Sequence, residues 1–227
     1  MTDTAGRSRR CRPSKLFAAV LAVVMAATLT AAGLVRGEDM NCTAWGLVFD
    51  GYGSASCRGK TVSLSPAPAT AADETHAGLA ASREVGVAPG RVTTFEATML
   101  TRRQLRRGSA PNPWEVAWLI WSYQDNDHFY ALVLKPNGWE VSKQNPAYPG
   151  KQQFLASGNT PRFAVGQEHH VVISIDTAAK GRMTAAITVD GEHLVSVTDT
   201  DSPYRSGAAA AYTEDAEVDV TITPSEP

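Results

Sequence analysis

The sequence has no excess of basic residues and almost none of the periodicity that helices need. Its 227 residues include 21 Lys and Arg against 23 Asp and Glu, which gives a formal net charge of −2. Without a basic excess, the chain lacks the electrostatic attraction to phosphates on which nucleic-acid binding depends. After residue 36, no segment longer than a turn or two repeats its apolar residues at the helical period. We therefore expect neither a nucleic-acid partner nor an α/β architecture.

Common catalytic and metal-binding spacings are also missing. Gly51 and Gly53 lie in a glycine-rich turn, yet neither a helix nor a Gly-Lys-Ser/Thr sequence follows, so this turn is not a phosphate loop. His169 and His170 are neighbours at the start of an expected strand, where successive side chains point to opposite faces, so they form a poor metal pair. No zinc spacing and no Ser/His/Asp order stands out. These motifs give no reason to expect a cofactor.

Charge is absent from one long apolar run near the N-terminus. Residues 1–15 are polar and basic, and residues 16–35 are apolar and uncharged, as is typical of a secretory signal peptide. A run of about 20 apolar residues can also remain as a membrane anchor. We expect a helical signal peptide or signal anchor over residues 1–36, a linker over 37–44, one domain over 45–223 and a tail over 224–227. The protein is then secreted and works outside the cytoplasm.

Cysteine is scarce, with three residues in the whole chain. Cys11 belongs to the N-terminal segment, which leaves Cys42 and Cys57 as an even pair in an oxidising compartment. We expect a disulfide between them, closing a loop of about 15 residues and stabilising the fold by about 3 kcal/mol. Two free, buried thiols are the alternative.

The stretch Trp114–Lys143 organises the rest of the chain. It predicts three antiparallel strands joined by tight turns at Asp125-Asn126 and Asn137-Gly138. Pairing outward from these turns places Trp121 opposite Tyr130 and sorts the side chains onto two faces. One face is almost wholly apolar and is expected to be the core: Val116, Trp118, Ile120, Phe129, Ala131 and Val133.

The opposite face of these strands mixes aromatic rings with titratable groups, as a sugar-binding groove does. Flat rings suit the C–H face of a sugar, and nearby polar groups suit its hydroxyls. The alternative is a second core face with polar residues near its rim. Glu115 and His128 are in addition weak candidates for acid/base catalysis. The expected glycan-binding residues are Glu115, Trp121, Tyr123, His128, Tyr130, Trp139, Lys143 and, from the following loop, Tyr148.

Four arginines between residues 102 and 107 precede this stretch. Such a group can bind an acidic glycan or a phosphate, or it can be an ordinary solvated loop. The remainder of the chain reads as short strands separated by frequent turn residues, with Gln144–Arg162 expected to be irregular. About ten strands indicate an all-β sandwich or barrel.

Three segments together resemble the concanavalin A-like lectin/glucanase superfamily, nearest to its laminin-G-like and 3-keto-disaccharide hydrolase-like secreted bacterial domains. They are Asn126–Leu132, Ile187–Leu194 and Gly207–Val218. The resemblance covers about residues 45–223 and implies a two-sheet antiparallel jelly-roll β-sandwich. Related glucanases carry a Glu-x-Asp-x-x-Glu motif that sets two carboxylates on one strand face for retaining hydrolysis, and this chain lacks that spacing.

The resemblance implies a function connected with carbohydrate. We expect a secreted, monomeric, non-catalytic protein that binds polysaccharide or oligosaccharide, with a glycoside hydrolase-like enzyme as the alternative. Proteins of this type often hold a structural Ca²⁺ near their termini, and Asp215 is the weak candidate ligand here. A carboxylate within roughly 5–10 Å of Glu115 across the groove would favour the hydrolase.

Overall fold

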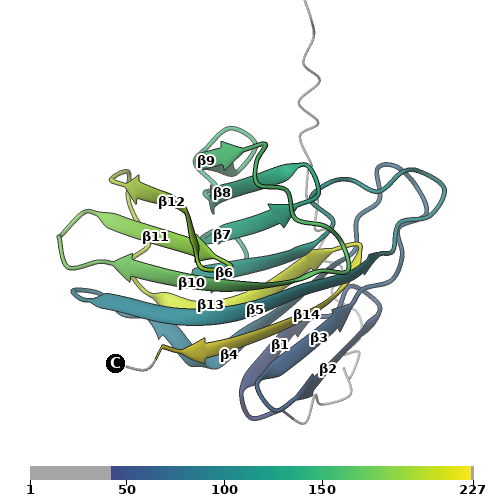
Figure 1. Cartoon of the computed structure of the whole chain (residues 1–227), viewed down its shortest axis with the longest axis horizontal. Helices are drawn as coiled ribbons and strands as arrows, with labels where there is room; N and C mark the ends of the chain where they lie inside the picture. Colours follow the sequence, from purple (N-terminus) through teal and green to yellow (C-terminus); the bar gives the residue numbers. More distant parts are fainter. Residues whose placement is uncertain (1–41, 226–227) are drawn as a thin grey trace, which may run out of the picture. The chain divides into compact units, whose positions relative to one another are not determined.

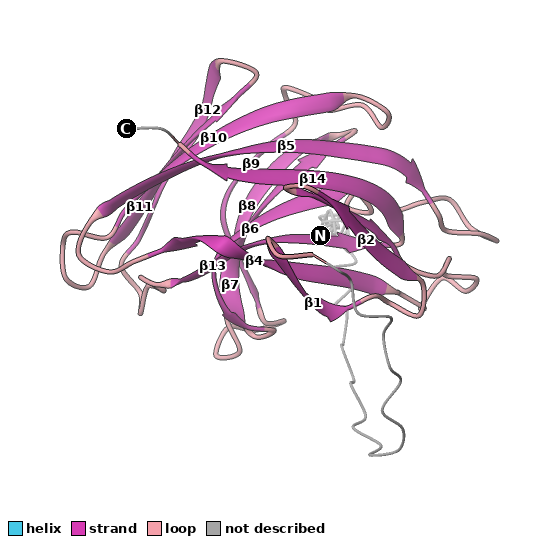
Figure 2. Ribbon diagram, turned by 90° about the horizontal axis from the view of Figure 1, so that it is seen from below, coloured by secondary structure: helices cyan, strands magenta, loops and turns pink. Residues whose placement is uncertain are grey.

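The computed structural model describes residues 42–225, which fold into fourteen β-strands without a helix. The expected signal segment over residues 1–36 and the first residues of the expected linker lie outside this range. Within residues 42–225, no helix is both long and apolar enough to cross a membrane. The strands form two seven-stranded antiparallel sheets, which face each other as separate layers (Figures 1 and 2).

The two sheets are called sheet A and sheet B. In sheet A the strand order is β1 (Trp45–Phe49), β4 (Ala77–Val87), β13 (Gly207–Glu214), β6 (Ala117–Asp125), β7 (His128–Lys135), β8 (Gly138–Gln144) and β9 (Gln152–Gly158). In sheet B it is β12 (Glu192–Asp199), β11 (Met183–Val189), β10 (Glu168–Asp176), β5 (Val92–Gln104), β14 (Ala216–Pro224), β3 (Thr61–Ser65) and β2 (Ser54–Arg58). The all-β sandwich is as expected, and β9 is an addition within a stretch that reads as irregular.

The main core fills the space between the sheets. Alternate residues of each strand point into it, as in β10, where Val171, Ile173 and Ile175 have no exposed surface. Sheet A contributes the other half, including Trp121 and Leu132. Burying this continuous apolar layer is the main favourable contribution to folding.

A second apolar cluster lies on the face of sheet A that points away from sheet B, which we call the outer face. Apart from adjoining loop residues, its members come from strands of sheet A alone, at positions that alternate with those of the main core. The cluster comprises Leu79, Val116, Trp118, Ile120, Phe129, Ala131, Val133, Ala210 and Tyr212.

The central hairpins keep most of the expected sorting of side chains, and Trp121 pairs with Tyr130 as predicted. Lys143 pairs with Tyr130 rather than with Leu132, a shift of two residues that keeps β8 side chains on their expected faces. Asp125 pairs with His128, so the first turn is one residue later than expected, and a register shift after Trp121 moves Tyr123 to the outer face, against Phe129.

The six residues predicted as core are buried, but in the outer-face cluster, and the face predicted as a groove is itself core, which is the alternative interpretation of that face. Trp121 and Tyr130 lie between the sheets with no exposed surface, whereas Trp118 belongs to the outer face.

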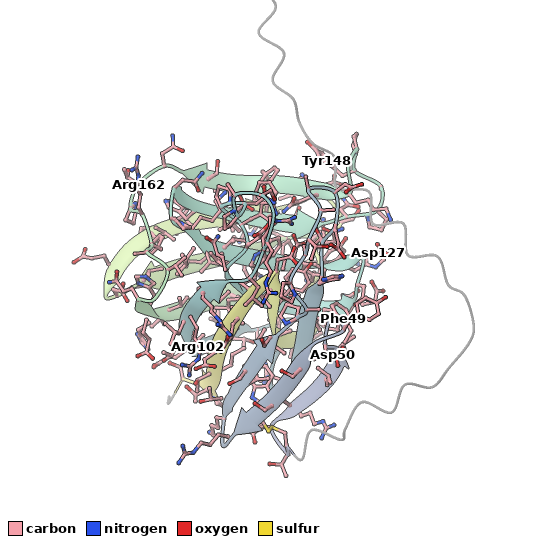
Figure 3. The ribbon with its side chains drawn as sticks, turned by 90° about the vertical axis from the view of Figure 1, so that its right-hand side faces the viewer. Phe49, Asp50, Arg102, Asp127, Tyr148 and Arg162 are labelled. Atoms are coloured by element: carbon pink, nitrogen blue, oxygen red, sulfur yellow. A yellow bond between two sulfur atoms is a disulfide. The ribbon has the colours of Figure 1, made fainter. Side chains whose placement is uncertain are left out.

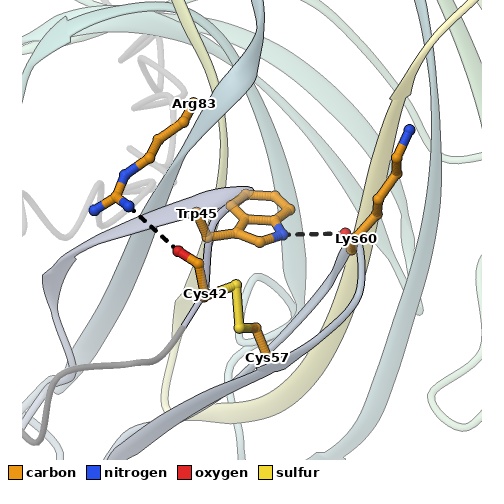
Figure 4. Close-up of a disulfide and its surroundings, with 5 residues drawn as sticks. All are labelled: Cys42, Trp45, Cys57, Lys60 and Arg83. Atoms are coloured by element: carbon orange, nitrogen blue, oxygen red, sulfur yellow. Dashed lines mark hydrogen bonds between the residues drawn. A yellow bond between two sulfur atoms is a disulfide. The ribbon is translucent and has the colours of Figure 1, made fainter.

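The predicted disulfide is confirmed (Figure 4). Cys42 and Cys57 are joined with a Cα–Cα distance of 6.0 Å and a sequence separation of 15 residues. Next to it, Trp45 is buried and its indole Nε1 donates to the carbonyl oxygen of Lys60 at 3.0 Å. The guanidinium of Arg83 donates to the carbonyl oxygen of Cys42 at 3.2 Å. The bridge therefore fixes β2 to the residues that precede β1, and Cys42 itself is part of the main core.

Candidate functional site

A cleft of about 240 Å³ opens along the β8–β9 edge of sheet A. Most of its lining is polar, and two of its residues carry opposite charges. The lining residues are Lys135, Asn137, Trp139, Glu140, Phe154, Ser157, Gly158 and Asn159. The volume lies just below the roughly 300–1,000 Å³ of typical small-molecule sites, and the cleft is open, so it fits part of a larger ligand.

The register of sheet A places the charged end of this cleft on the outer face. Glu140 pairs with Val133 on β7 and with Ser157 on β9, so these side chains stand in one row across the sheet. Lys135 donates to the carboxylate of Glu140. Their side chains are only 15% and 10% exposed, so water screens this ion pair less than a surface pair.

An exposed aromatic ring lies beside this polar row. Phe154 on β9 pairs with Ser142 and is 57% exposed, which is unusual for so large an apolar side chain. Next to it, the side-chain amide of Gln152 donates to the hydroxyl of Ser142 at 3.1 Å. The arrangement offers a flat apolar surface with hydrogen-bonding groups around it.

Trp139 and Gly158 form the back of the cleft. A side-chain carbon on Gly158 would come within 2.7–2.9 Å of the Trp139 ring, so only glycine lets the strand lie against the indole. The indole Nε1 donates to the carbonyl oxygen of Thr160 at 2.9 Å, which holds the ring in place. Trp139 is 8% exposed and is the one expected glycan-binding residue that lines this cleft.

Lys143 and Tyr130, expected in a sugar-binding groove, are instead part of a buried network. Lys143 Nζ lies 2.9 Å from the carboxylate of Asp199, which also accepts a hydrogen bond from Tyr130 at 2.6 Å. Lys143 Nζ also lies 4.7 Å from the centre of the Tyr204 ring. Burial, followed by the hydrogen bond to Asp199, raises the pKa of Tyr130. Neither residue is exposed, so neither can contact a glycan.

Trp121 is excluded from the groove for the same reason. Its ring stacks on Tyr130 with centroids 5.5 Å apart and planes 18° from parallel. Both rings are part of the main core and have no exposed surface. The contact stabilises the sandwich rather than a ligand.

Glu115 is also buried, where it pairs with an arginine. Arg106 Nε donates to Glu115 at 2.5 Å, and another nitrogen of the same guanidinium donates to Asp215 at 3.0 Å. The three side chains are at most 2% exposed. Asn112 donates a further hydrogen bond to Glu115 at 2.7 Å. Arg106, one of the four clustered arginines, is therefore a buried residue that pairs with Glu115 and Asp215. Asp215 is a second carboxylate near Glu115, but it lies inside the protein and not across a groove.

The residues around Asp215 do not fit a Ca²⁺ ion. One carboxylate oxygen accepts from the backbone N–H groups of Ala69 and His76, each at 3.1 Å, and the other accepts from Arg106. A Ca²⁺ ion requires several oxygen ligands, whereas here protein donors already fill the carboxylate. In the part of the chain that the structure describes, no group of three or more His, Cys, Asp or Glu side chains is placed to hold a metal ion.

Three further expected residues gather at another end of the sandwich. His128 Nδ1 lies 2.7 Å from Asp125, and the Tyr123 hydroxyl donates to Asn126 at 2.7 Å. Tyr148 is 44% exposed and lies on the same side of the molecule as Asp127, as Figure 3 shows. These accessible groups lie apart from the cleft, and a role for Tyr123, His128 and Tyr148 in glycan binding stays a prediction.

The main cleft residues that sequence reasoning missed are Lys135, Glu140 and Phe154. The segment Gln152–Gly158 lies between Pro149, Gly150 and Pro161, which hides a seven-residue strand among turn signals. The segment reads QQFLASG, without an alternation of apolar and polar residues, so the sequence carries no periodic indication of this strand. Lys135 and Glu140 flank the hairpin turn at positions where charged residues are usually just solvated.

Comparison with known proteins gives similarity in structure but not in sequence. No protein-family model and no curated protein sequence matches the chain. Among solved structures, the carbohydrate recognition domain of Emp46p in its metal-free form has a TM-score of 0.50 and 9% identity, over 81% of this chain and 92% of that one. An endo-β-1,4-glucuronan lyase from the fungus Trichoderma reesei has a TM-score of 0.46 and 11% identity, over 87% and 92%. A variant of human galectin-16 has a TM-score of 0.42 and 12% identity, over 70% of this chain and 99% of that one.

At such low identities, these similarities concern the fold and not the activity. The two seven-stranded antiparallel sheets and the Emp46p similarity lead to the same architecture. The chain has a two-sheet antiparallel β-sandwich fold of the concanavalin A-like kind, similar to that of the Emp46p carbohydrate recognition domain.

Proposed function

We propose that this protein is a secreted, non-catalytic glycan-binding module whose ligand binds in the cleft at the β8–β9 edge of sheet A. The observation that carries the proposal is the exposed ring of Phe154 beside a polar row that ends in the Lys135–Glu140 ion pair. The fold is one that a carbohydrate recognition domain, that of Emp46p, also has.

The chemistry of the cleft suits a sugar. A sugar ring has an apolar C–H face that packs on an aromatic ring and a rim of hydroxyls that both donate and accept hydrogen bonds. Phe154 supplies the ring, and the carboxylate of Glu140 supplies acceptors. Asn137 and Asn159 offer amides that donate and accept. Lys135 neutralises Glu140, so the site favours a neutral sugar unit over a strongly charged one.

A glycoside hydrolase is the weaker candidate. Hydrolysis requires two carboxyl groups that flank the scissile bond and reach it. Glu115 and Asp215 lie on one guanidinium, but their side chains are 1% and 0% exposed. The cleft itself is lined by a single carboxylate, that of Glu140. The described residues therefore supply the groups that binding needs, whereas the pair of accessible carboxyl groups that catalysis needs is not among those that line the cleft.

Action outside the cytoplasm is part of the proposal. A disulfide persists in oxidising compartments and is rare in the cytosol. The Cys42–Cys57 bridge therefore supports export, together with the signal-like pattern of residues 1–35.

The test is a glycan array on the purified protein, followed by titration of the strongest ligands against three variants. Phe154→Ala and Glu140→Gln should each weaken binding by about tenfold or more, because they remove the stacking ring and an acceptor of the cleft. Tyr52→Ala is the matched control, since Tyr52 is 89% exposed and follows β1, at the opposite edge of sheet A. Unchanged affinity in both cleft variants would refute this location, and an array without a bound glycan would refute the function.

A further inference from the structure

The buried cluster at Arg106 joins three separate segments at one end of the sandwich. Arg106 donates to the carbonyl oxygens of Ala71 and Glu74 in the β3–β4 loop, residues 66–76, at 2.7 and 3.0 Å. Asp215 lies in the turn between β13 and β14, and its carboxylate accepts from backbone N–H groups of the same loop. Its backbone N–H donates to the carbonyl oxygen of His76, and its carbonyl oxygen accepts from the N–H of Leu105. The cluster is therefore one anchor of the loop, beside the backbone hydrogen bonds from Ala67 to Gly51 and from Arg107 to Ala69.

Negative charge exceeds positive charge in the cluster. Glu214, next to Asp215, is 6% exposed and accepts a hydrogen bond from the Tyr212 hydroxyl at 2.6 Å. With Glu115 and Asp215 it makes three buried carboxyl groups around one guanidinium. Three ionised carboxylates could not all be compensated by one Arg106, and an uncompensated buried charge is strongly unfavourable.

An unpartnered atom indicates the same excess. Oε2 of Glu115 is buried and has no hydrogen-bond partner, although its other oxygen has two donors. Burial raises the pKa of Glu214 to about 7; the hydrogen bond from Tyr212 opposes this shift, and the charges of Asp215 and Glu115 add to it. Burial also raises the pKa of Asp215, but Asp215 is bonded to the Arg106 cation and to two backbone N–H groups, whereas Glu214 is bonded to the uncharged Tyr212 hydroxyl. Glu214 is therefore the carboxyl group that holds the proton most readily.

We propose that the cluster of Arg106, Glu115, Glu214 and Asp215 is a proton-operated latch that holds the β3–β4 loop when Glu214 is protonated and loosens it when Glu214 loses its proton. In the latched state two carboxylates face one guanidinium and the protonated Glu214 is neutral. In the unlatched state a third charge repels its two neighbours, and the loop contacts of Arg106 and Asp215 weaken. This device is independent of glycan binding in the cleft.

The other charged groups near Glu214 come from every element that packs against it. Its own strand supplies Tyr212, and the following turn supplies Asp215. The segment between β5 and β6 supplies Arg106 and Glu115. The β3–β4 loop supplies His76, whose Nε2 lies 3.2 Å from Glu74, and the next residue, Ala77, pairs with Glu214 in the sheet. His76 is thus the group whose own titration an experiment must separate from that of Glu214.

The direction of the effect follows from proton linkage. A carboxyl group whose pKa is higher in the closed state than in the open state binds more protons when closed. Closure is therefore favoured at low pH, weakens between the pKa of an exposed glutamate, about 4.5, and the value of about 7 for Glu214, and stays weakened above it.

Hydrogen–deuterium exchange of the full chain, corrected for the intrinsic effect of pH, measures the latch directly. Protection of backbone amides in residues 66–76 should fall by roughly tenfold or more between about pH 5.5 and about pH 8.5. Glu214→Gln keeps an acceptor for Tyr212 but cannot ionise, so it should remove this fall. Glu217→Gln is the matched control, because Glu217 is on β14, pairs with Arg103 at the surface and should leave the fall unchanged.

The outcomes separate the possible causes. A fall that persists in Glu214→Gln would show that another group carries it and would overturn the proposal, and protection that does not change with pH would also overturn it. If Glu214→Gln does not fold, the pH dependence of protection in Glu115→Gln tests the proposal instead. This variant keeps an acceptor for Arg106 and removes a charge that raises the pKa of Glu214, so the midpoint of the fall should move to lower pH. An unmoved midpoint would contradict the latch.

Discussion

At the scale of single residues, the buried charges are the clearest features of this protein. Lys143 pairs with Asp199, and Arg106 pairs with Glu115 and Asp215, with all of these side chains at most 2% exposed. Such pairs stabilise little compared with apolar packing, but removal of one partner leaves an isolated charge. The residues are therefore essential to the fold without being part of a ligand site.

Replacement of Arg106 by Met should destabilise the protein by about 3–5 kcal/mol, because Glu115 and Asp215 then remain buried without a counter-charge. Urea unfolding at neutral pH measures the loss. Arg103→Met, which affects an exposed ion pair with Glu217, should change the free energy of unfolding little. Similar losses in both variants would contradict the account of the cluster.

Replacement of Trp121 by Ala tests which face of sheet A is the core. The ring is fully buried against Tyr130, so its loss should lower the free energy of unfolding by about 3–5 kcal/mol. Tyr52→Ala removes an exposed ring and should cost little. A Trp121 variant as stable as the wild type, with reduced glycan binding, would instead favour the groove predicted from the sequence.

At the scale of elements, the sequence determines the sorting of side chains better than the direction in which each face points. The pair of Trp121 with Tyr130 is predicted correctly, although the first turn is one residue later than expected and a register shift after Trp121 compensates for this. The same shift moves Tyr123 to the outer face, which the period of two does not predict. Both faces are rich in apolar residues, so hydrophobicity alone does not identify the inner one. The partner that makes Lys143 an internal residue is Asp199, which is remote in sequence and lies on β12 of sheet B.

The β8–β9 hairpin should be sensitive to the size of residue 158. Gly158→Ala places a carbon into the Trp139 ring and within reach of its hydrogen bond to Thr160. Such overpacking should cost about 1–3 kcal/mol and displace the edge of the cleft. Thermal unfolding and glycan titration should both show a loss. Gly166→Ala, at a position where an added carbon meets no neighbouring atom, reports on backbone strain alone.

The disulfide should stabilise the β1–β2 region through its loop closure. Replacing Cys42 and Cys57 together by Ser should lower the free energy of unfolding by about 3 kcal/mol, the value expected for a loop of 15 residues. Urea unfolding of this double variant, compared with the wild type in the presence and absence of a reductant, provides the measurement. A wild type whose stability the reductant does not change would contradict this contribution.

At the scale of the whole molecule, the fold class could be read from the sequence, but the position of the candidate site could not. Frequent turn residues, short alternating segments and the lack of helical periodicity indicate a sandwich or a barrel, and the family resemblance favours the sandwich. The cleft combines Lys135 on β7, Glu140 on β8 and Phe154 on β9, so it exists only once the register of three strands is known. Sequence analysis treats the segment containing β9 as irregular and therefore lacks one wall of the site.

The central claim is that a glycan binds at the β8–β9 edge of sheet A. The most direct measurement is hydrogen–deuterium exchange of the protein with and without the strongest ligand from the array. The account predicts added protection in Gly138–Gln144 and Gln152–Gly158, and little change at Asp125–His128. Protection at the Asp125–His128 tip and around Tyr148, with no change in β8 and β9, would contradict it.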